Sequence, residues 1–206
     1  MYLRCDCFLD VLLTRCSIRR FKPDPLPDEV ILKIIEAGIR APTAGGGEQW
    51  FFIIVKDAGK RKKIHELLFR AHKKYALEVL RNTLPPHKVE KWMKRIIEGM
   101  YLAPVYIAAY IDLRWRLYKD EFFEFERISA IQSLAAAIEN MLLAAHSMGL
   151  GGVWLGVPLL MREEFDSILE PPEKCELQGL IALGYPAEKK KYAIRSKKVE
   201  DVIKII

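Results

Sequence analysis

One long uncharged stretch constrains the fold of this chain more than any other feature. Residues 134–161 read LAAAIENMLLAAHSMGLGGVWLGVPLLM, and no charged residue occurs from Met141 to Met161. That length is enough to cross a bilayer, which takes about 20 residues. A membrane span must be a continuous helix, because unpaired backbone groups are costly in lipid. The glycines between 149 and 152, together with Pro158, interrupt the stretch. It therefore predicts a buried helix, a turn and a strand.

The helical part of this stretch has a regular apolar pattern. Apolar residues recur at alternating spacings of three and four, at Ile128, Ile131, Ala135, Ile138, Leu142 and Ala145. This periodicity is typical of a seam between helices. Most other positions are small or apolar, so the pattern places the helix at the centre of the fold or of a dimer.

The rest of the chain alternates between helical and β-rich segments. Helices are expected at 8–16, at 28–40, through most of 59–99 with a break at 84–87, and over the last eight or so residues. Strands are expected at 49–57, 103–113, 153–157 and 177–186, the first of them buried on both faces. No linker or repeat divides these elements. The pattern predicts one domain over residues 1–206 with mixed α and β architecture around a central sheet.

Composition narrows the class of protein. The chain is 51% hydrophobic and 29% charged, which is typical of a soluble globular protein. The pattern of a signal peptide is not seen at its start. Its four cysteines fit reduced thiols, so we expect a cytoplasmic protein. A net charge of +6 raises nucleic acid as a partner, but the basic residues are scattered without interleaved aromatics, which disfavours it.

Two short segments have the residue types of a binding site. In RCSIRRF, three arginines surround Ser17, and their forked donors suit a phosphate or a carboxylate. An exposed helix end rich in arginine is the alternative. In APTAGGGEQW, consecutive small residues let backbone N–H groups approach a ligand closely. An ordinary loop between a helix and a strand is the alternative there.

Motifs for other chemistries do not stand out. GLGG follows a helix and precedes a strand, which is the wrong order for a dinucleotide-binding unit. The four histidines are dispersed, and His146 is expected to be a core or cap residue. With few candidate acids and bases, an enzyme of this sequence is easiest to understand if a cofactor performs the chemistry.

Taken in order, these segments resemble the flavin-dependent nitroreductases. The matching segments are RCSIRRF, VILKIIEAGIRAPTAGGGEQWFFIIV, AAAIENMLLAAHSMGLGGVWLG and LIALGYPAEKK…IRSKKVEDVI. They run from about residue 9 to the end, with 60–100 as the variable part. The resemblance implies an α+β fold with a central mixed sheet flanked by helices. It also implies an intertwined homodimer with FMN at the interface, NAD(P)H as the donor, and a nitroaromatic, quinone or similar small molecule as the acceptor.

The resemblance assigns roles to particular positions. Arg15 and Arg195 match the arginines that pair with the FMN phosphate, while Ser17 and Arg19 match positions that reach the ribityl chain and the flavin pyrimidine. A cation near the N1–O2 edge stabilises the anionic reduced flavin. The loop at 43–46 matches one that meets the flavin ring from the partner subunit. The candidate cofactor-binding residues are Arg15, Cys16, Ser17, Arg19, Pro42, Thr43, Ala44, Gly45, Gly46, Trp154, Leu155, Gly156 and Arg195.

The strand at 154–156 matches the one that faces the N5–O4 edge of the flavin, where backbone N–H groups donate. Hydride transfer at N5 needs stacking and orientation more than a protein acid or base, so we assign no catalytic residue. No metal is expected.

The chain departs from the usual loop pattern of the family, A-P-S-x-x-N-x-Q-P-W. Gly46 replaces the asparagine, Glu48 the glutamine and Gln49 the proline, and Cys16 stands where arginine or histidine is common. The missing asparagine predicts altered flavin orientation or redox tuning, and Cys16 predicts a weaker grip on the phosphate. Other flavin chemistry on the same fold, such as dehalogenation, flavin fragmentation or azoline dehydrogenation, stays open, as does a flavin- or nucleic-acid-binding protein without turnover.

Overall fold

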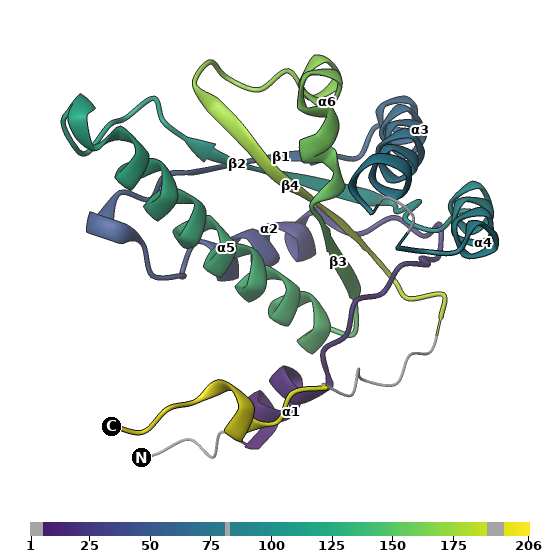
Figure 1. Ribbon diagram of the computed structural model, residues 1–206, viewed down its shortest axis with the longest axis horizontal. Coiled ribbons are helices and arrows are strands. Elements are labelled where there is room, and N and C mark those ends of the chain that lie inside the picture. Colours follow the sequence, from purple (N-terminus) through teal and green to yellow (C-terminus); the bar gives the residue numbers. More distant parts are fainter. Residues whose placement is uncertain (1–5, 81–82, 189–195) are drawn as a thin grey trace.

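The computed structural model describes residues 6–80, 83–188 and 196–206 (Figure 1). Its elements follow in the order α1 (Asp6–Thr14), α2 (Asp28–Gly38), the 3-10 turn η1 (Ala44–Gly46), β1 (Trp50–Val55), α3 (Ala58–Lys74), the π-helical turn η2 (Tyr75–Val79), α4 (Pro86–Ile97), β2 (Val105–Asp112), the 3-10 turn η3 (Asp120–Phe122), α5 (Phe123–Ser147), β3 (Gly151–Leu155), the 3-10 helix η4 (Val157–Met161), α6 (Arg162–Leu169), β4 (Cys175–Gly184) and the 3-10 turn η5 (Val199–Val202).

In the described part of the chain, four strands form one sheet in the order β1-β2-β4-β3, and each neighbouring pair is antiparallel. Beyond β3, an isolated parallel bridge joins Ser17 to Gly152. This bridge adds a parallel contact to the sheet. Helices cover both faces (Figure 1), so the expected α+β fold with a central sheet flanked by helices is confirmed.

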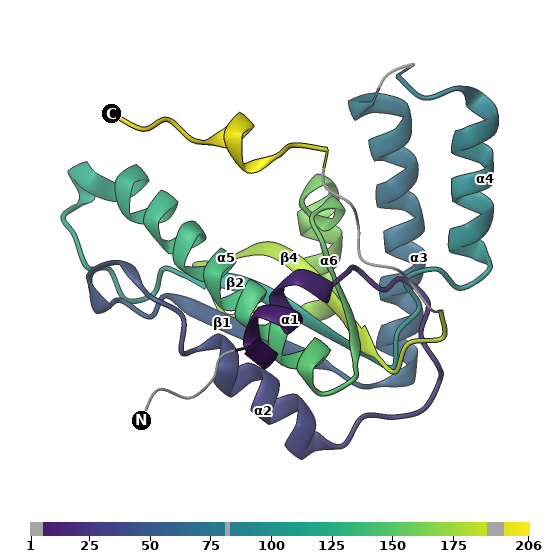
Figure 2. The ribbon, with the colours of Figure 1, turned by 90° about the horizontal axis from the view of Figure 1, so that it is seen from below.

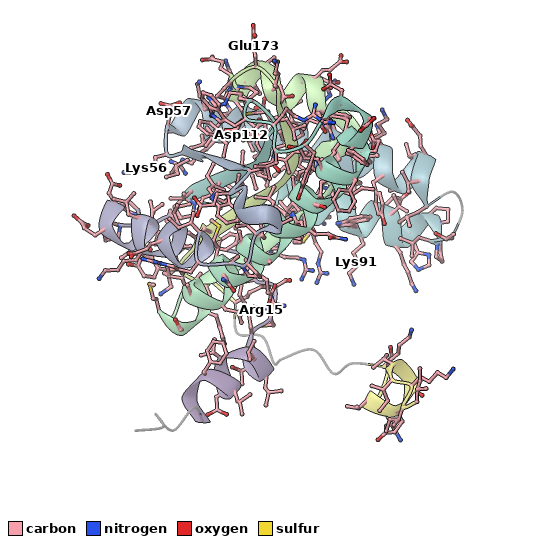
Figure 3. The ribbon with its side chains drawn as sticks, turned by 90° about the vertical axis from the view of Figure 1, so that its left-hand side faces the viewer. Arg15, Lys56, Asp57, Lys91, Asp112 and Glu173 are labelled. Carbon is pink, nitrogen blue, oxygen red and sulfur yellow. The ribbon has the colours of Figure 1, made fainter. Side chains whose placement is uncertain are left out.

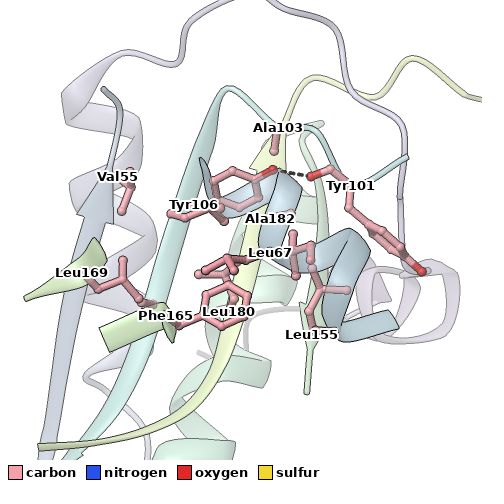
Figure 4. Close-up of a cluster of buried hydrophobic side chains, with 14 of the residues drawn as sticks. Val55, Leu67, Tyr101, Ala103, Tyr106, Leu155, Phe165, Leu169, Leu180 and Ala182 are labelled. Carbon is pink, nitrogen blue, oxygen red and sulfur yellow. Dashed lines mark hydrogen bonds between the residues drawn. The ribbon is translucent and has the colours of Figure 1, made fainter. Parts of the chain in front are cut away.

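The central strand β2 explains why the sheet is covered on both faces. All eight of its residues are buried, and successive side chains point to opposite faces. Tyr106, Ala108 and Tyr110 pack in the cluster that includes side chains of α3 and α6 (Figure 4). Ile107, Ala109 and Ile111 pack in the cluster that includes side chains of α2 and α5. A strand buried on both faces reads as a continuous apolar run.

Helix α5 is the long helix that the sequence predicts. It ends where Gly149 adopts a left-handed conformation, with φ of 76°, and the Gly149 N–H donates to the His146 carbonyl at 3.0 Å. The predicted seam is only half buried in this chain. Ile138, Leu142 and Ala145 are buried, whereas Ile128 is 51% exposed. The face on the sheet instead continues through Leu134, Ala137 and Met141, among others.

By length and composition alone, one helical stretch in the described part of the chain, Asp120–Ser147, could cross a membrane. Half of its most apolar window is buried inside the protein, because α5 packs on β2, β3 and β4. This apolar stretch is therefore the helix that covers one face of the sheet.

Two predicted elements differ in the structure. The strand at 49–57 was expected to be buried on both faces, but β1 is an edge strand whose residues are mostly half-buried, since it has one sheet neighbour. The prediction of an amphipathic helix at the C-terminus is wrong as well. Only the 3-10 turn Val199–Val202 forms, and residues 196–206 are exposed. In Figure 2 this segment extends away from the sheet, so no apolar face holds a longer helix in place.

Candidate functional site

The arginine segment after α1 is held along the edge of the sheet. The Ile18 N–H donates to the Gly152 carbonyl at 3.1 Å, and the Lys22 N–H donates to the Tyr185 carbonyl at 2.8 Å. The backbone thus follows β3 and then the end of β4. Arg19 lies between these two contacts, and its N–H donates to Oε1 of Glu188 at 2.8 Å. Sheet contacts before and after Arg19 therefore fix its position.

The start of the same segment is tied to α5. Nε of Arg15 lies 3.1 Å from Oε1 of Glu139, and Oγ1 of Thr14 lies 3.0 Å from Nε2 of His146. Figure 3 shows Arg15 where α1 meets the rest of the molecule. Burial, and then the nearby Arg15 charge, lower the pKa of His146. His146, on α5, thus contacts α1 through Thr14.

A cavity of about 470 Å³ opens beside the Arg19 segment. Its wall includes Arg19, residues 154–156 at the end of β3, and aromatic side chains from α3, η2 and α4. The volume lies in the range of small-molecule sites, about 300–1,000 Å³. The cavity brings a cation, strand backbone and aromatic rings to one place.

Strand β3 supplies backbone polar groups to this cavity. It is an edge strand, because β4 is its one neighbour in the sheet, and the parallel bridge at Gly152 precedes residues 154–156. An edge strand presents a row of N–H and C=O groups that the sheet does not use. Gly179 on β4 makes room for Trp154, since a Cβ there would lie 2.2 Å from Nε1 of the indole.

The aromatic wall is built around His72. Its ring stacks on Tyr101 with a centroid distance of 4.7 Å, and it meets Trp92 edge-on at 5.3 Å. Nδ1 donates to the Leu68 carbonyl at 2.7 Å, which leaves Nε2 as the ring atom able to accept a proton. Burial lowers the pKa of His72, so the ring is neutral at physiological pH.

Tyr101 has an unusual backbone at the cavity wall. Its φ is +73°, a conformation that residues other than glycine adopt in only a few per cent of cases. Two hydrogen bonds hold it, each at 2.7 Å: its N–H donates to the Arg19 carbonyl, and its carbonyl accepts from the Tyr106 hydroxyl. Figure 4 shows the second of these bonds. Strain of this kind costs about 1–3 kcal/mol and clusters at functional sites.

The glycine-rich loop lies elsewhere in the same chain. The Ala44 N–H donates to Oγ of Ser133 at 3.1 Å, and the Glu48 N–H donates to Oγ1 of Thr43 at 2.9 Å. Ser133 precedes His146 by thirteen residues on α5, which is about 20 Å along a helix axis. The loop at 42–46 therefore contacts α5 about 20 Å from the Thr14–His146 contact.

A buried carboxylate that sequence reasoning missed supports the loop. Glu126 is fully buried, and it accepts hydrogen bonds from Nε2 of Gln49 at 2.9 Å, from the Leu117 N–H at 2.6 Å and from Nε of Arg116 at 2.6 Å. Burial alone would raise its pKa, but these donors outweigh burial and lower it. Its place four residues before Ala130, on the buried face of α5, is the signal that could have found it.

The candidate residues thus fall into two groups. Arg15, Cys16, Ser17 and Arg19 form one short segment that the structure brings to β3 and residues 154–156. The second group, residues 42–46, contacts α5 at Ser133. Arg195 lies outside the described residues.

Known proteins share both the sequence pattern and the fold. A model of the nitroreductase family matches residues 12–185. A protein of Methanothermobacter thermautotrophicus that bears the name NADH dehydrogenase/NAD(P)H nitroreductase is 32% identical over 184 residues, covering 87% of this chain and 78% of its own length.

Two solved structures are similar over most of both chains. One is a Desulfovibrio desulfuricans protein of nitroreductase name in complex with FMN, with a TM-score of 0.68, 25% identity and coverage of 95% of this chain and 94% of its own. The other is a BluB-like flavoprotein of Clostridium difficile, with a TM-score of 0.74, 26% identity and coverage of 97% and 98%. By the match over most of its length, this chain belongs to the nitroreductase family.

Proposed function

We propose that this protein is an FMN-dependent oxidoreductase. In this proposal NAD(P)H reduces the flavin, and the flavin passes the electrons to a nitroaromatic, quinone or similar small acceptor. The observation that supports this most is the cavity in which Arg19, the edge of β3 and the aromatic rings around His72 meet. The family to which the chain belongs and the FMN in a similar solved structure support it as well.

The residues present suit FMN. A phosphate needs fixed cations, and Arg15 is held by Glu139. The N1–O2 edge of the flavin suits a cation as well, and the backbone of Arg19 is anchored at the sheet edge. The polar edge of a flavin needs donors, which the N–H groups at 154–156 can provide. The ring needs a flat apolar surface, and the cavity of about 470 Å³ has aromatic walls.

When bound, FMN supplies the hydride chemistry, so the protein binds, orients and protects. Arg19 places a fixed positive charge at the cavity wall. Trp92 and Tyr101 give the cavity apolar area that excludes water. The lowered pKa of His72 keeps its ring neutral at physiological pH. The ring therefore adds no second positive charge beside Arg19.

We further propose that the protein works as a homodimer with FMN at the interface. The separation of the glycine loop from the Arg19 cavity supports this, because a two-fold partner can bring its own loop to the cavity. Exposed apolar side chains also support it. Leu13 of α1 is 72% exposed and Phe125 of α5 is 61% exposed. The apolar residues of 196–206 are exposed too, so within the described residues nothing covers these surfaces.

An absorbance spectrum of the purified protein tests the proposal. We expect flavin bands without added cofactor, and bleaching of those bands after anaerobic addition of NADH or NADPH. Admission of a nitroaromatic or a quinone should restore them. A colourless protein that takes up no added FMN contradicts the proposal.

The same experiment separates the other chemistries. Bands that persist with both donors indicate a flavin protein without this turnover. Flavin bands that bleach but do not return after air or a quinone is admitted indicate consumption of the flavin, which mass spectrometry of the released cofactor would detect.

A further inference from the structure

A second cavity of about 520 Å³ adjoins the first and is strongly cationic. Arg19, Trp92 and Tyr101 line both cavities, so the two share a wall. The second one, which we call the cationic recess, is otherwise lined by Arg20, Lys88, Lys91, Arg95, Met100 and Glu188. Five cations thus face one carboxylate, and that carboxylate already accepts the Arg19 N–H.

Three of these cations lie on one face of α4. Lys88, Lys91 and Arg95 are spaced by three and four residues, which places them above one another on a helix. Like charges at this spacing destabilise a helix by about 0.2–0.5 kcal/mol per pair. In Figure 3, Lys91 and Arg15 both lie along the lower border of the body formed by the sheet and its covering helices.

The nearby acids do not neutralise this face. Glu98 pairs with Lys94 at 3.9 Å and with Arg20 at 3.7 Å. Within the described residues, the ion pairs of α4 do not include Lys88, Lys91 or Arg95. Among the residues that the structure describes, the α4 side of the recess therefore gathers positive charge that no ion pair balances.

We propose that the cationic recess binds the 2′-phosphate of NADPH, and so makes NADPH the preferred hydride donor. The inference rests on the proposed function, which calls for a nicotinamide donor without choosing between NADH and NADPH. NADPH differs from NADH by one phosphomonoester, which is close to a dianion at neutral pH. Guanidinium and ammonium groups are the side chains that hold such a group.

The position of the recess fits the length of such a donor. A nicotinamide stacked on a flavin in the first cavity leaves its adenosine end to extend past the shared wall of Trp92 and Tyr101. The Trp92 indole lines the recess beside Lys88 and Lys91, so an adenine base has an aromatic surface next to the cations.

Direct binding tests this without relying on turnover. Calorimetric titration of the purified, flavin-loaded protein at low salt compares adenosine 2′,5′-bisphosphate with adenosine 5′-monophosphate. We expect the bisphosphate to bind at least tenfold more tightly, and the difference to shrink as salt is raised. Equal affinities for the two compounds overturn the proposal.

A pair of triple variants locates the site. Lys88→Ala/Lys91→Ala/Arg95→Ala should abolish the preference for the bisphosphate. The control variant Lys62→Ala/Lys63→Ala/Arg70→Ala removes the same charge from exposed positions of α3. This variant should retain the preference for the bisphosphate. In steady-state kinetics the α4 variant should lose at least tenfold in kcat/KM for NADPH and stay within twofold for NADH. Equal losses in both variants overturn the proposal, because they reflect total charge alone.

FMN carries a phosphomonoester of its own, and its affinity distinguishes the two sources. The α4 variant should hold FMN as tightly as the parent protein. If its FMN affinity falls while bisphosphate binding is unchanged, the recess holds the flavin phosphate and the proposal is wrong.

Failure of the proposed function looks different. A protein that binds the bisphosphate through α4 but takes up no flavin contradicts the oxidoreductase proposal and leaves the recess as an adenosine phosphate site. A flavin protein that NADH and NADPH reduce equally well contradicts the recess proposal alone.

Discussion

The two ends of α5 each hold one segment of the candidate site, but they do so through different kinds of contact. Near its N-terminal end, the buried Glu126 holds Gln49 and the segment at 116–117, and so supports the glycine-rich loop. At its C-terminal end, a contact between Thr14 and His146 and a partly exposed ion pair between Arg15 and Glu139 hold the arginine segment. One end is fixed by a satisfied buried charge, and the other by partly exposed side-chain contacts.

The difference indicates which end tolerates change. A buried carboxylate with three donors is rigid, because the loss of any partner leaves a buried polar group unsatisfied. Contacts at the exposed end contribute little to stability, since water competes for them. We therefore expect substitutions at the N-terminal end to affect folding, and substitutions at the C-terminal end to affect cofactor binding.

The largest expected effect is on folding. Glu126→Ala should lower the free energy of unfolding by about 3 kcal/mol, because Arg116 and the Leu117 N–H lose a buried acceptor. Urea denaturation of the purified protein measures this. Glu124→Ala is the matched control, since Glu124 lies on the surface of the same turn, and it should cost less than about 1 kcal/mol. Equal costs would show that the buried network adds nothing.

The second effect is on the cofactor. Arg15→Ala/Arg195→Ala should raise the dissociation constant for FMN at least 100-fold, about 3 kcal/mol, because each substitution removes a charged donor to the phosphate. Fluorescence titration of the flavin-free protein measures it. The unfolding free energy should change little, since the Arg15–Glu139 pair is partly exposed. A double variant that retains FMN as tightly as the parent rules out these two arginines as the phosphate ligands.

The third test asks whether the two ends meet across a dimer. Arg19→Glu damages the cavity, and Gly45→Val damages the loop, because the backbone there has φ of 57°. Each homodimer should bind no FMN. A heterodimer isolated with two different tags has one site with both changes and one with neither. We expect that heterodimer to bind one FMN. A flavin-free heterodimer would show that the cavity and the loop of each site come from the same chain.

The buried carboxylate at the N-terminal end of α5 should also make the stability of the protein depend on pH. The pKa of Glu126 lies below its ordinary value of 4.5, so the unfolded chain takes up the proton first as pH falls. This contribution to stability is present above pH 4.5 and is lost as pH falls through the folded pKa. Stability measured from pH 6 downwards should therefore decline less steeply in Glu126→Gln than in the parent. Parallel curves would contradict the prediction.

The smallest effect concerns the glycine that departs from the family pattern. Gly46 has φ of 69° and a Cβ there would meet nothing within 4 Å, so Gly46→Asn should cost less than about 1 kcal/mol. At Gly45 a Cβ would lie 2.9 Å from the Tyr118 hydroxyl, so Gly45→Asn should cost more. Thermal denaturation ranks the two. If the flavin spectrum of Gly46→Asn matches that of the parent, the missing asparagine does not tune the cofactor.

The sequence predicted the elements whose burial is uniform. The apolar run at 103–113 became β2, and the break at 84–87 separates α3 from α4, because periodicity and proline act locally. The edge position of β1 was not predictable, since strand order depends on long-range pairing. The C-terminal helix failed because an amphipathic pattern forms a helix only when another surface covers its apolar face.

The candidate site shows the same distinction between what local patterns predict and what long-range packing decides. Sequence motifs pointed to the arginine segment and the glycine loop, because each is a short run of unusual residue types. The strand at 154–156 was assigned through the resemblance to the family. Tertiary structure decided which of them meet. In the fold, Arg19 lies beside β3 and the loop contacts α5 nearer its other end. His72, Tyr101 and the cations of α4 line the cavities beside Arg19. Side chains distant in sequence are brought together by packing on the sheet, and no local pattern encodes that distance.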